Sequence, residues 1–190
     1  MNKEWSELNK TMQAQIKKKD TYKMGIDTLL NLRSQLMQTL VSFKAELCRE
    51  DFNAIPFINA DGYHSKTIAY SIWHIFRIED IVAHTVINED EQVFFSGNYQ
   101  ERINSPIITT GNELVKQQIA DFSKQLNLEE LYSYIFEVRE STEKMLERLS
   151  YDELKRKIPE ERKGYLESLN VVNDNEKAIW LIDYWCNKDI

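Results

Sequence analysis

Turn-forming residues are scarce in this chain, which has five glycines and three prolines among its 190 residues. Sheet proteins need many tight turns, and glycine and proline are the residues that most often supply them. The scarcity therefore favours a few long helices joined by a small number of connections. The length suits one domain with a sizeable core, so we expect a single domain over residues 1–190.

Apolar residues recur at steps of three and four, the spacing that places them on one face of a helix. Residues 3–19 predict a polar first helix, and Asp20 is a candidate cap for the second. The core-facing stripe of that second helix is Leu29, Leu32, Leu36, Leu40, Phe43 and Leu47. Asn127 to Leu149 is the clearest late helix. The chain is therefore expected to be all-α, a helical bundle with long crossovers at 50–63 and 89–110.

Several helix starts carry the capping-box pattern, in which an N-cap oxygen and a glutamate three residues later satisfy each other's backbone donors. The pairs are Thr110 with Glu113, Asn127 with Glu130, Ser150 with Glu153, and Asn173 with Glu176. Ser65 is the expected N-cap of a helix that runs to about Asn88. Val93 to Phe95, in the second crossover, reads as an exposed apolar run.

The most unusual segment is Ser71–Asp80, SIWHIFRIED, which places a histidine, an arginine and two acidic residues in an apolar helix. Burying polar groups costs free energy unless they are paired, so this pattern indicates a functional site. Glu79 and Asp80 are adjacent and point about 100° apart around the helix. They cannot form a paired-carboxylate site alone, but one of them could orient His74 or an arginine of a neighbouring helix.

The three histidines, His64, His74 and His84, are each ten residues apart. Ten residues span about 15 Å along a helix, whereas zinc–nitrogen bonds are about 2 Å, so at most one can serve a given ion. His74 is the leading candidate, as a metal ligand or general base, and the alternative is an interior histidine bonded to neighbouring side chains. His84 with Asp80 is expected to form a surface or interface hydrogen bond, and His64 is expected to be exposed.

Charge and composition exclude several classes of protein. The formal net charge of −7 argues against nucleic acid as a general partner. No run of about 18 apolar residues is present, so we expect no membrane span. The first residues lack the apolar core of a signal peptide, which makes a cytoplasmic location the expectation. Cys48 and Cys186 form no C-x-x-C motif and are expected to be reduced structural thiols.

The stretch from Trp73 to Asp80, which follows a long helix and a crossover, resembles the DinB/YfiT-like superfamily of bacterial four-helix-bundle proteins. The resemblance implies an up-down-down-up bundle that is often dimeric. Many members bind zinc or nickel through three side chains, mainly histidines, and some are metal-dependent thiol transferases. By position, the first metal histidine of the family corresponds to His74. The match at the level of residues covers about ten positions.

The chain departs from the family where the other two ligands are expected, because no histidine follows His84. In the family these ligands come from a late helix, whereas the final helix here, Asn175 to Ile190, offers three carboxylates and one thiol. Those residues are Glu176, Asp183, Asp189 and Cys186. Either the metal site has been lost, or a C-terminal piece that relatives carry is absent.

Two functions remain open. One is a DinB-like protein with an incomplete divalent-metal site at His74 and an unidentified small-molecule substrate. The other is a metal-free binding or interaction module, in which the apolar final helix, rich in tryptophan and tyrosine, serves the core or a homodimer interface. An aromatic substrate wall is a third role for that helix.

Overall fold

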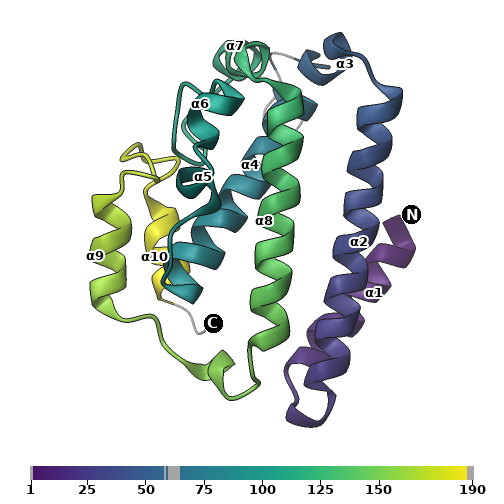
Figure 1. The fold of residues 1–190 in the computed structure, drawn as a ribbon, viewed down its shortest axis with the longest axis vertical. Helices are drawn as coiled ribbons and strands as arrows, with labels where there is room; N and C mark the ends of the chain where they lie inside the picture. Colours follow the sequence, from purple (N-terminus) through teal and green to yellow (C-terminus); the bar gives the residue numbers. More distant parts are fainter. Residues whose placement is uncertain (1, 58, 60–64, 188–190) are drawn as a thin grey trace.

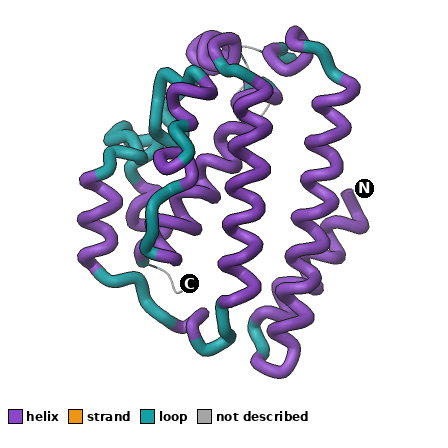
Figure 2. Tube along the Cα trace, in the orientation of Figure 1, coloured by secondary structure: helices purple, strands orange, loops and turns teal. Residues whose placement is uncertain are grey.

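The computed structural model of this protein describes residues 2–57, 59 and 65–187. Every regular element in that part of the chain is a helix, as Figures 1 and 2 show, and it contains no strand. The all-α expectation is therefore confirmed. The helices span α1 Asn2–Ile16, α2 Tyr22–Glu46, α3 Arg49–Asn53, α4 Ile68–Asp80, α5 Val93–Ser96, α6 Tyr99–Ile103, α7 Gln117–Gln125, α8 Leu128–Arg148, α9 Glu160–Ser168 and α10 Trp180–Cys186.

Three shorter helical segments connect these helices. They are the 3₁₀ turns η1 Lys19–Thr21 and η4 Glu153–Lys155, and the π-helical segment η3 Ile81–Asn88. Because η3 continues α4 without a break, one rod runs from Ile68 to Asn88, which agrees with the expected end of this helix. The helix α1 packs against α2, and α2, α8 and the α4–η3 rod form the long elements of the molecule (Figure 1).

The main core lies where α4, α8 and the upper part of α2 meet. Trp73 and Phe76 of α4 and Ile135 of α8 are fully or almost fully buried there. Leu40 is buried on α2, but Leu29 and Leu32, at the other end of the predicted stripe, are only half-buried. In the same part of the molecule, a groove of about 450 Å³ lies between α2 and the end of α8, lined by Ile26 and Leu30 on α2 and by Leu146 on α8.

A second, smaller core joins η3 to the C-terminal helices. Ile81 and Val86 of η3 pack against Leu166 of α9 and Leu181 of α10. The final helix, expected over Asn175–Ile190, spans only Trp180–Cys186 in the described residues, and residues 188–190 lie outside them. The apolar final helix therefore buries one face, while its other face remains exposed.

Local signals located some helix starts correctly and others wrongly. Asn127 caps α8, with its side-chain oxygen accepting from the amides of Glu129 and Glu130. The cap of α4 is Thr67 rather than Ser65, since the Thr67 hydroxyl accepts from the Tyr70 amide at 3.0 Å. Asp20 does not cap α2, because it lies within η1 and Thr21 occupies the N-cap position.

Two of the predicted capping boxes begin no helix. At Thr110 the chain enters the left-handed region at Gly111 (φ +75°), and Glu113 is bonded by Thr109 instead, so α7 starts only at Gln117. At Asn173 the side chain caps a turn at Asn175, and α10 begins later. The Ser150 and Glu153 pair does form, with the Ser150 amide donating to the Glu153 carboxylate at 2.7 Å.

No helix in the described part of the chain is both long enough and apolar enough to cross a membrane. Cys48, which is exposed, and Cys186, which is half-buried, are both free thiols.

Candidate functional site

One face of α4 holds a loop, residues 105–116, that we call the strap. Its carbonyl oxygens accept hydrogen bonds from three polar side chains of α4. The Tyr70 hydroxyl bonds Gly111 O at 2.8 Å, His74 Nδ1 bonds Thr110 O at 2.7 Å, and Arg77 Nε bonds Ile108 O at 3.0 Å. Residues spaced by four and three share one helix face. Three of the polar residues on this part of α4 thus have a structural partner.

His74 is held in one orientation at the edge of the strap. A carbonyl oxygen can only accept, so Nδ1 must carry the proton and Nε2 the lone pair when the ring is neutral. The ring also stacks on Tyr70, with 5.4 Å between centroids and 11° between planes. No hydrogen bond to Nε2 is present among the described residues. The side chain of His74 is half-buried. Its Nε2 is therefore available as a hydrogen-bond acceptor or a metal donor.

Two charged side chains act on His74, Lys66 from just before α4 and Glu113 from the strap. Burial lowers the pKa of His74, and the positive charge of Lys66 adds to this, while the Thr110 carbonyl and the Glu113 carboxylate oppose it. Lys66 lies over the ring of Tyr70, 4.5 Å from its centroid. The net effect of these surroundings is a lowered pKa, which favours the neutral ring.

Glu113 lies in the strap and is the acidic neighbour of His74. Its Oε1 accepts a short hydrogen bond from the Thr109 hydroxyl. Its Oε2 is fully buried and has no hydrogen-bond partner among the described residues. An unpaired buried carboxylate oxygen costs free energy, so a donor or a cation at this point would be favourable.

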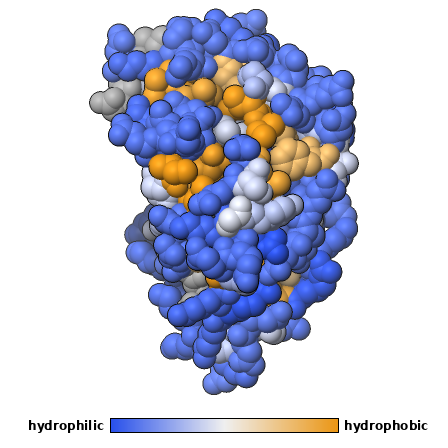
Figure 3. All heavy atoms as spheres, turned by 90° about the vertical axis from the view of Figure 1, so that its left-hand side faces the viewer, coloured by the Kyte–Doolittle hydropathy of each residue, from blue (hydrophilic) through white to orange (hydrophobic). Residues whose placement is uncertain are grey.

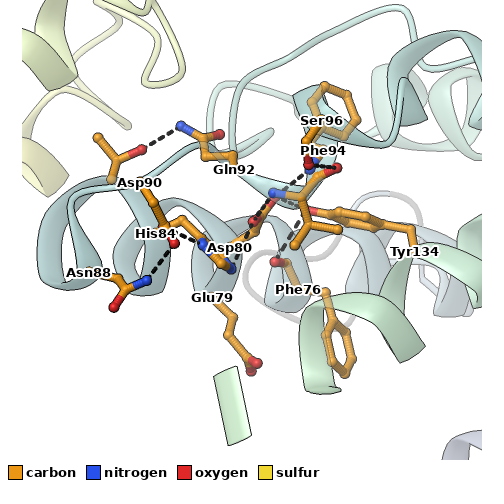
Figure 4. A network of polar contacts seen from close by, with 12 residues as sticks. Phe76, Glu79, Asp80, His84, Asn88, Asp90, Gln92, Phe94, Ser96 and Tyr134 are labelled. Atoms are coloured by element: carbon orange, nitrogen blue, oxygen red, sulfur yellow. Dashed lines mark hydrogen bonds and ion pairs between the residues drawn. The ribbon is translucent and has the colours of Figure 1, made fainter. Parts of the chain in front are cut away.

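Asp80 forms the centre of a second, buried network (Figure 4). Its carboxylate accepts from the amides of Val93 and Phe94, both at 2.9 Å, and from the Tyr134 hydroxyl at 2.8 Å. Burial raises the pKa of this carboxyl, whereas Arg77 and the amide and hydroxyl donors lower it. Because Asp80 binds the first amides of α5, it turns Val93 and Phe94 inward. The expectation of an exposed apolar run at this segment is wrong for that reason.

Arg77 is the cation of this network and is completely buried. Its Nη1 lies 3.4 Å from Asp80 Oδ2, and its guanidinium lies 4.3 Å from the Phe94 ring centroid. Its Nη2 has no hydrogen-bond partner within the described residues. The pair of Arg77 and Asp80 thus fixes α4, the strap and α5 to one another.

His84 differs from its prediction. It was expected to form a surface or interface hydrogen bond with Asp80, but it is 5 % exposed and its Nδ1 bonds Asp90 at 2.6 Å. Its Nε2 lies 4.0 Å from Asp80 Oδ1 and makes no hydrogen bond to any described residue. The turn after η3 causes the change, since it brings Asp90 back over the ring (Figure 4).

Glu79 fulfils one of the two roles considered for it. It forms a two-pronged ion pair with Arg33 of α2, at 2.9 and 2.7 Å, rather than orienting His74. His64 lies outside the described residues. The structure therefore separates the polar residues of the α4 segment into a strap-holding face, a buried ion pair and a link to α2.

Two residues of these networks, Glu113 and Asp90, were not identified from sequence. The sequence pattern around Glu113 predicts only a helix cap, and Asp90 lies in a crossover with no motif of its own. A carboxylate placed six residues after a buried histidine carries no periodic signal. The described residues contain no group of three histidine, cysteine, aspartate or glutamate side chains that could hold a metal ion.

Comparison with known proteins adds no assignment: the sequence matches no family model and no curated protein.

The lowered pKa of His74 makes stability depend on pH. Above the ordinary value of 6.5 the ring is neutral in both the folded and the unfolded state. As the pH falls below 6.5 the unfolded chain takes up the proton first, so the free energy of unfolding decreases until the folded-state pKa is passed. We expect this decrease to be smaller in His74→Asn, measured as urea unfolding at pH 7.5, 6.5 and 5.5 with a chelator present. An equal decrease in the variant would contradict the assignment.

Proposed function

We propose that this chain is a DinB-like helical-bundle protein that binds a divalent metal ion at His74, with Nε2 as the donor. The observation that carries the proposal is the 2.7 Å hydrogen bond between His74 Nδ1 and Thr110 O. Histidines that ligate metals almost always donate their other ring N–H to a carbonyl or carboxylate, which fixes the tautomer and the ring orientation. The up-down-down-up arrangement of the family is part of the same proposal.

The donor set supports a site with two protein ligands. The neutral ring of His74 offers Nε2, and Glu113 of the strap offers the buried Oε2 that has no partner among the described residues. Nitrogen and carboxylate oxygen are the ligand types that zinc and nickel accept. Lys66 opposes a cation at this point, and catalytic zinc sites use three protein ligands. We therefore expect modest affinity, with water or a substrate in the remaining positions.

A metal ion bound there would supply a Lewis acid able to polarise a ligand. The residues of the chain would hold and orient the ligands of the metal ion. Thr110 and Tyr70 orient the imidazole, and the strap carries Glu113.

The proposal is tested by calorimetric titration of chelator-treated protein with Zn²⁺ and Ni²⁺. We expect one site per chain, at least tenfold weaker in His74→Ala and several-fold weaker in Glu113→Gln. His84→Ala is the matched control, because it removes the other described histidine and is expected to keep the affinity. Equal affinity in His74→Ala, or no binding by the unmodified chain, would exclude the metal site.

A second candidate function, a metal-free interaction module, is favoured by the outer face of α10. Ile179, Trp180 and Tyr184 are 42 %, 49 % and 51 % exposed, and the two aromatic rings lie 5.7 Å apart. Large exposed apolar patches often mark protein interfaces. Figure 3 shows apolar side chains gathered in the upper half of the face that carries α9.

This candidate predicts a homodimer formed through α10. Light scattering of the purified chain should give twice the monomer mass, and the double variant Trp180→Ser, Tyr184→Ser should be monomeric. Val41→Ser, at an exposed apolar residue of α2, is the control. A monomer at all concentrations would rule the homodimer out.

A further inference from the structure

A cleft of about 400 Å³ lies between the segment from η3 to α5 and the helix α9. Its apolar lining comes from Phe95 of α5, Ile108 of the strap, and Tyr165 and Leu169 from α9 and its C-terminal end. Asp90 and Glu91, both exposed, also line it and place two carboxylates at its rim. The volume falls in the range of small-molecule sites, which combine apolar walls with a few placed polar groups.

The polar group inside the cleft is the amide of Gln92, which is 1 % exposed. Its Nε2 donates to the hydroxyl of Thr85 at 2.6 Å, and Thr85 is equally buried. Its Oε1 is fully buried and accepts no hydrogen bond from any described residue. A buried acceptor without a donor is unfavourable, so a ligand whose N–H group reaches Oε1, with a small movement of the side chain, would gain that hydrogen bond.

The charged residues around the cleft indicate what charge a ligand that donates to Gln92 would carry. Asp90 is bonded by His84 at 2.6 Å and by the Asn88 amide, and Glu91 forms no ion pair among the described residues. Arg156 and Arg162 are paired with Glu89, at 3.7 and 2.7 Å. The buried Arg77, which lies 5.5 Å from the Phe95 ring centroid and donates to the Ile108 carbonyl, is paired with Asp80. The rim therefore attracts a cation, and the apolar lining excludes a strongly hydrated one such as a bare metal ion.

We propose that this cleft binds a small organic cation, a primary ammonium group attached to an aromatic or branched apolar body. The ammonium group donates to Gln92 Oε1 and lies in the field of Asp90 and Glu91. The apolar body packs against Phe95, Ile108 and Leu169, and the half-exposed Tyr165 ring covers it from the α9 side.

This site is separate from the metal proposal, since none of its lining residues contacts His74 or Glu113 through a hydrogen bond or ion pair that the structure contains. A failure of one proposal leaves the other unchanged.

The test uses two probes of the same shape and opposite charge, phenethylamine and phenylacetate, titrated into the full chain by NMR and calorimetry. We expect phenethylamine to bind at least tenfold more tightly, because a hydrogen bond to a charged donor and the two carboxylates all favour the amine. The shifted amide signals should be those of Gln92, Phe95 and Leu169.

Three variants locate the site. Leu169→Trp, at a half-buried residue of the lining, should fill the cleft and abolish binding, and Gln92→Met should weaken it at least fivefold. Glu46→Gln, an exposed change at the end of α2, should leave it unaltered. Equal affinity for the two probes, no binding of phenethylamine, or unchanged binding in a folded Leu169→Trp protein would overturn the proposal.

Discussion

Replacing Asp80 with alanine is expected to destabilise the protein by about 3–5 kcal/mol, the cost of leaving one charge of a buried ion pair without its partner. The change removes the acceptor of the Val93 and Phe94 amides and of the Tyr134 hydroxyl. It also leaves Arg77, which is completely buried, without its carboxylate partner. Urea unfolding followed by circular dichroism measures the loss.

Two further variants show whether the unpaired charge is the cause. Adding Arg77→Met to Asp80→Ala should cost less than the two single changes together, because the buried cation is then absent. Asp152→Ala removes an exposed ion pair with Lys19 of 2.9 Å and should cost less than about 1 kcal/mol. Additive losses in the double variant would mean that Asp80 acts through its backbone and tyrosine contacts alone.

Trp73→Ala is expected to have a similarly large effect, about 3–5 kcal/mol, because it empties the centre of the main core. The indole is completely buried, with centroids 5.4 Å from Phe94 and 5.5 Å from Phe122. It also lies 6.3 Å from Tyr134, so three helices would lose contacts at once. Chemical denaturation measures this loss as well.

Trp73→Phe separates two contributions of this residue to stability, the packing of its ring and the burial of its unpaired N–H group. The indole N–H has no hydrogen-bond partner among the described residues, so its removal relieves a buried unpaired donor. This gain partly offsets the smaller ring, and we expect a loss well below that of Trp73→Ala. If Trp73→Phe were as damaging as Trp73→Ala, ring packing would not be the main contribution of this residue.

The fold class could be predicted from sequence because its signals are local and repeated. Few turn residues, apolar steps of three and four, and the cap at Asn127 all agree with one another. Thr110 shows where such signals fail. Its capping pattern is intact, but Tyr70 and His74 bond the carbonyls of Gly111 and Thr110, and no helix begins there.

The candidate site could be predicted only in part, because some of its contacts are local and others join residues that are distant in the sequence. Position on one helix allowed the inference that Glu79 or Asp80 could meet an arginine of another helix, and Glu79 does so. The partners of His84 and Asp80 lie beyond a turn, at Asp90 and the start of α5. Such long-range pairs depend on how the chain folds back and leave no periodic trace in the sequence.

The most direct test of the central claim, that His74 Nε2 is the donor for a divalent metal ion, is long-range ¹H–¹⁵N NMR of the histidine rings. In the chelated protein at pH 7.5, His74 should show a protonated Nδ1 and an unprotonated Nε2, because Nδ1 donates to Thr110. Stoichiometric Zn²⁺ should then shift the Nε2 resonance of His74 and leave His84 unchanged. A His74 ring protonated at Nε2, or a zinc-induced shift confined to other histidines, would contradict the claim.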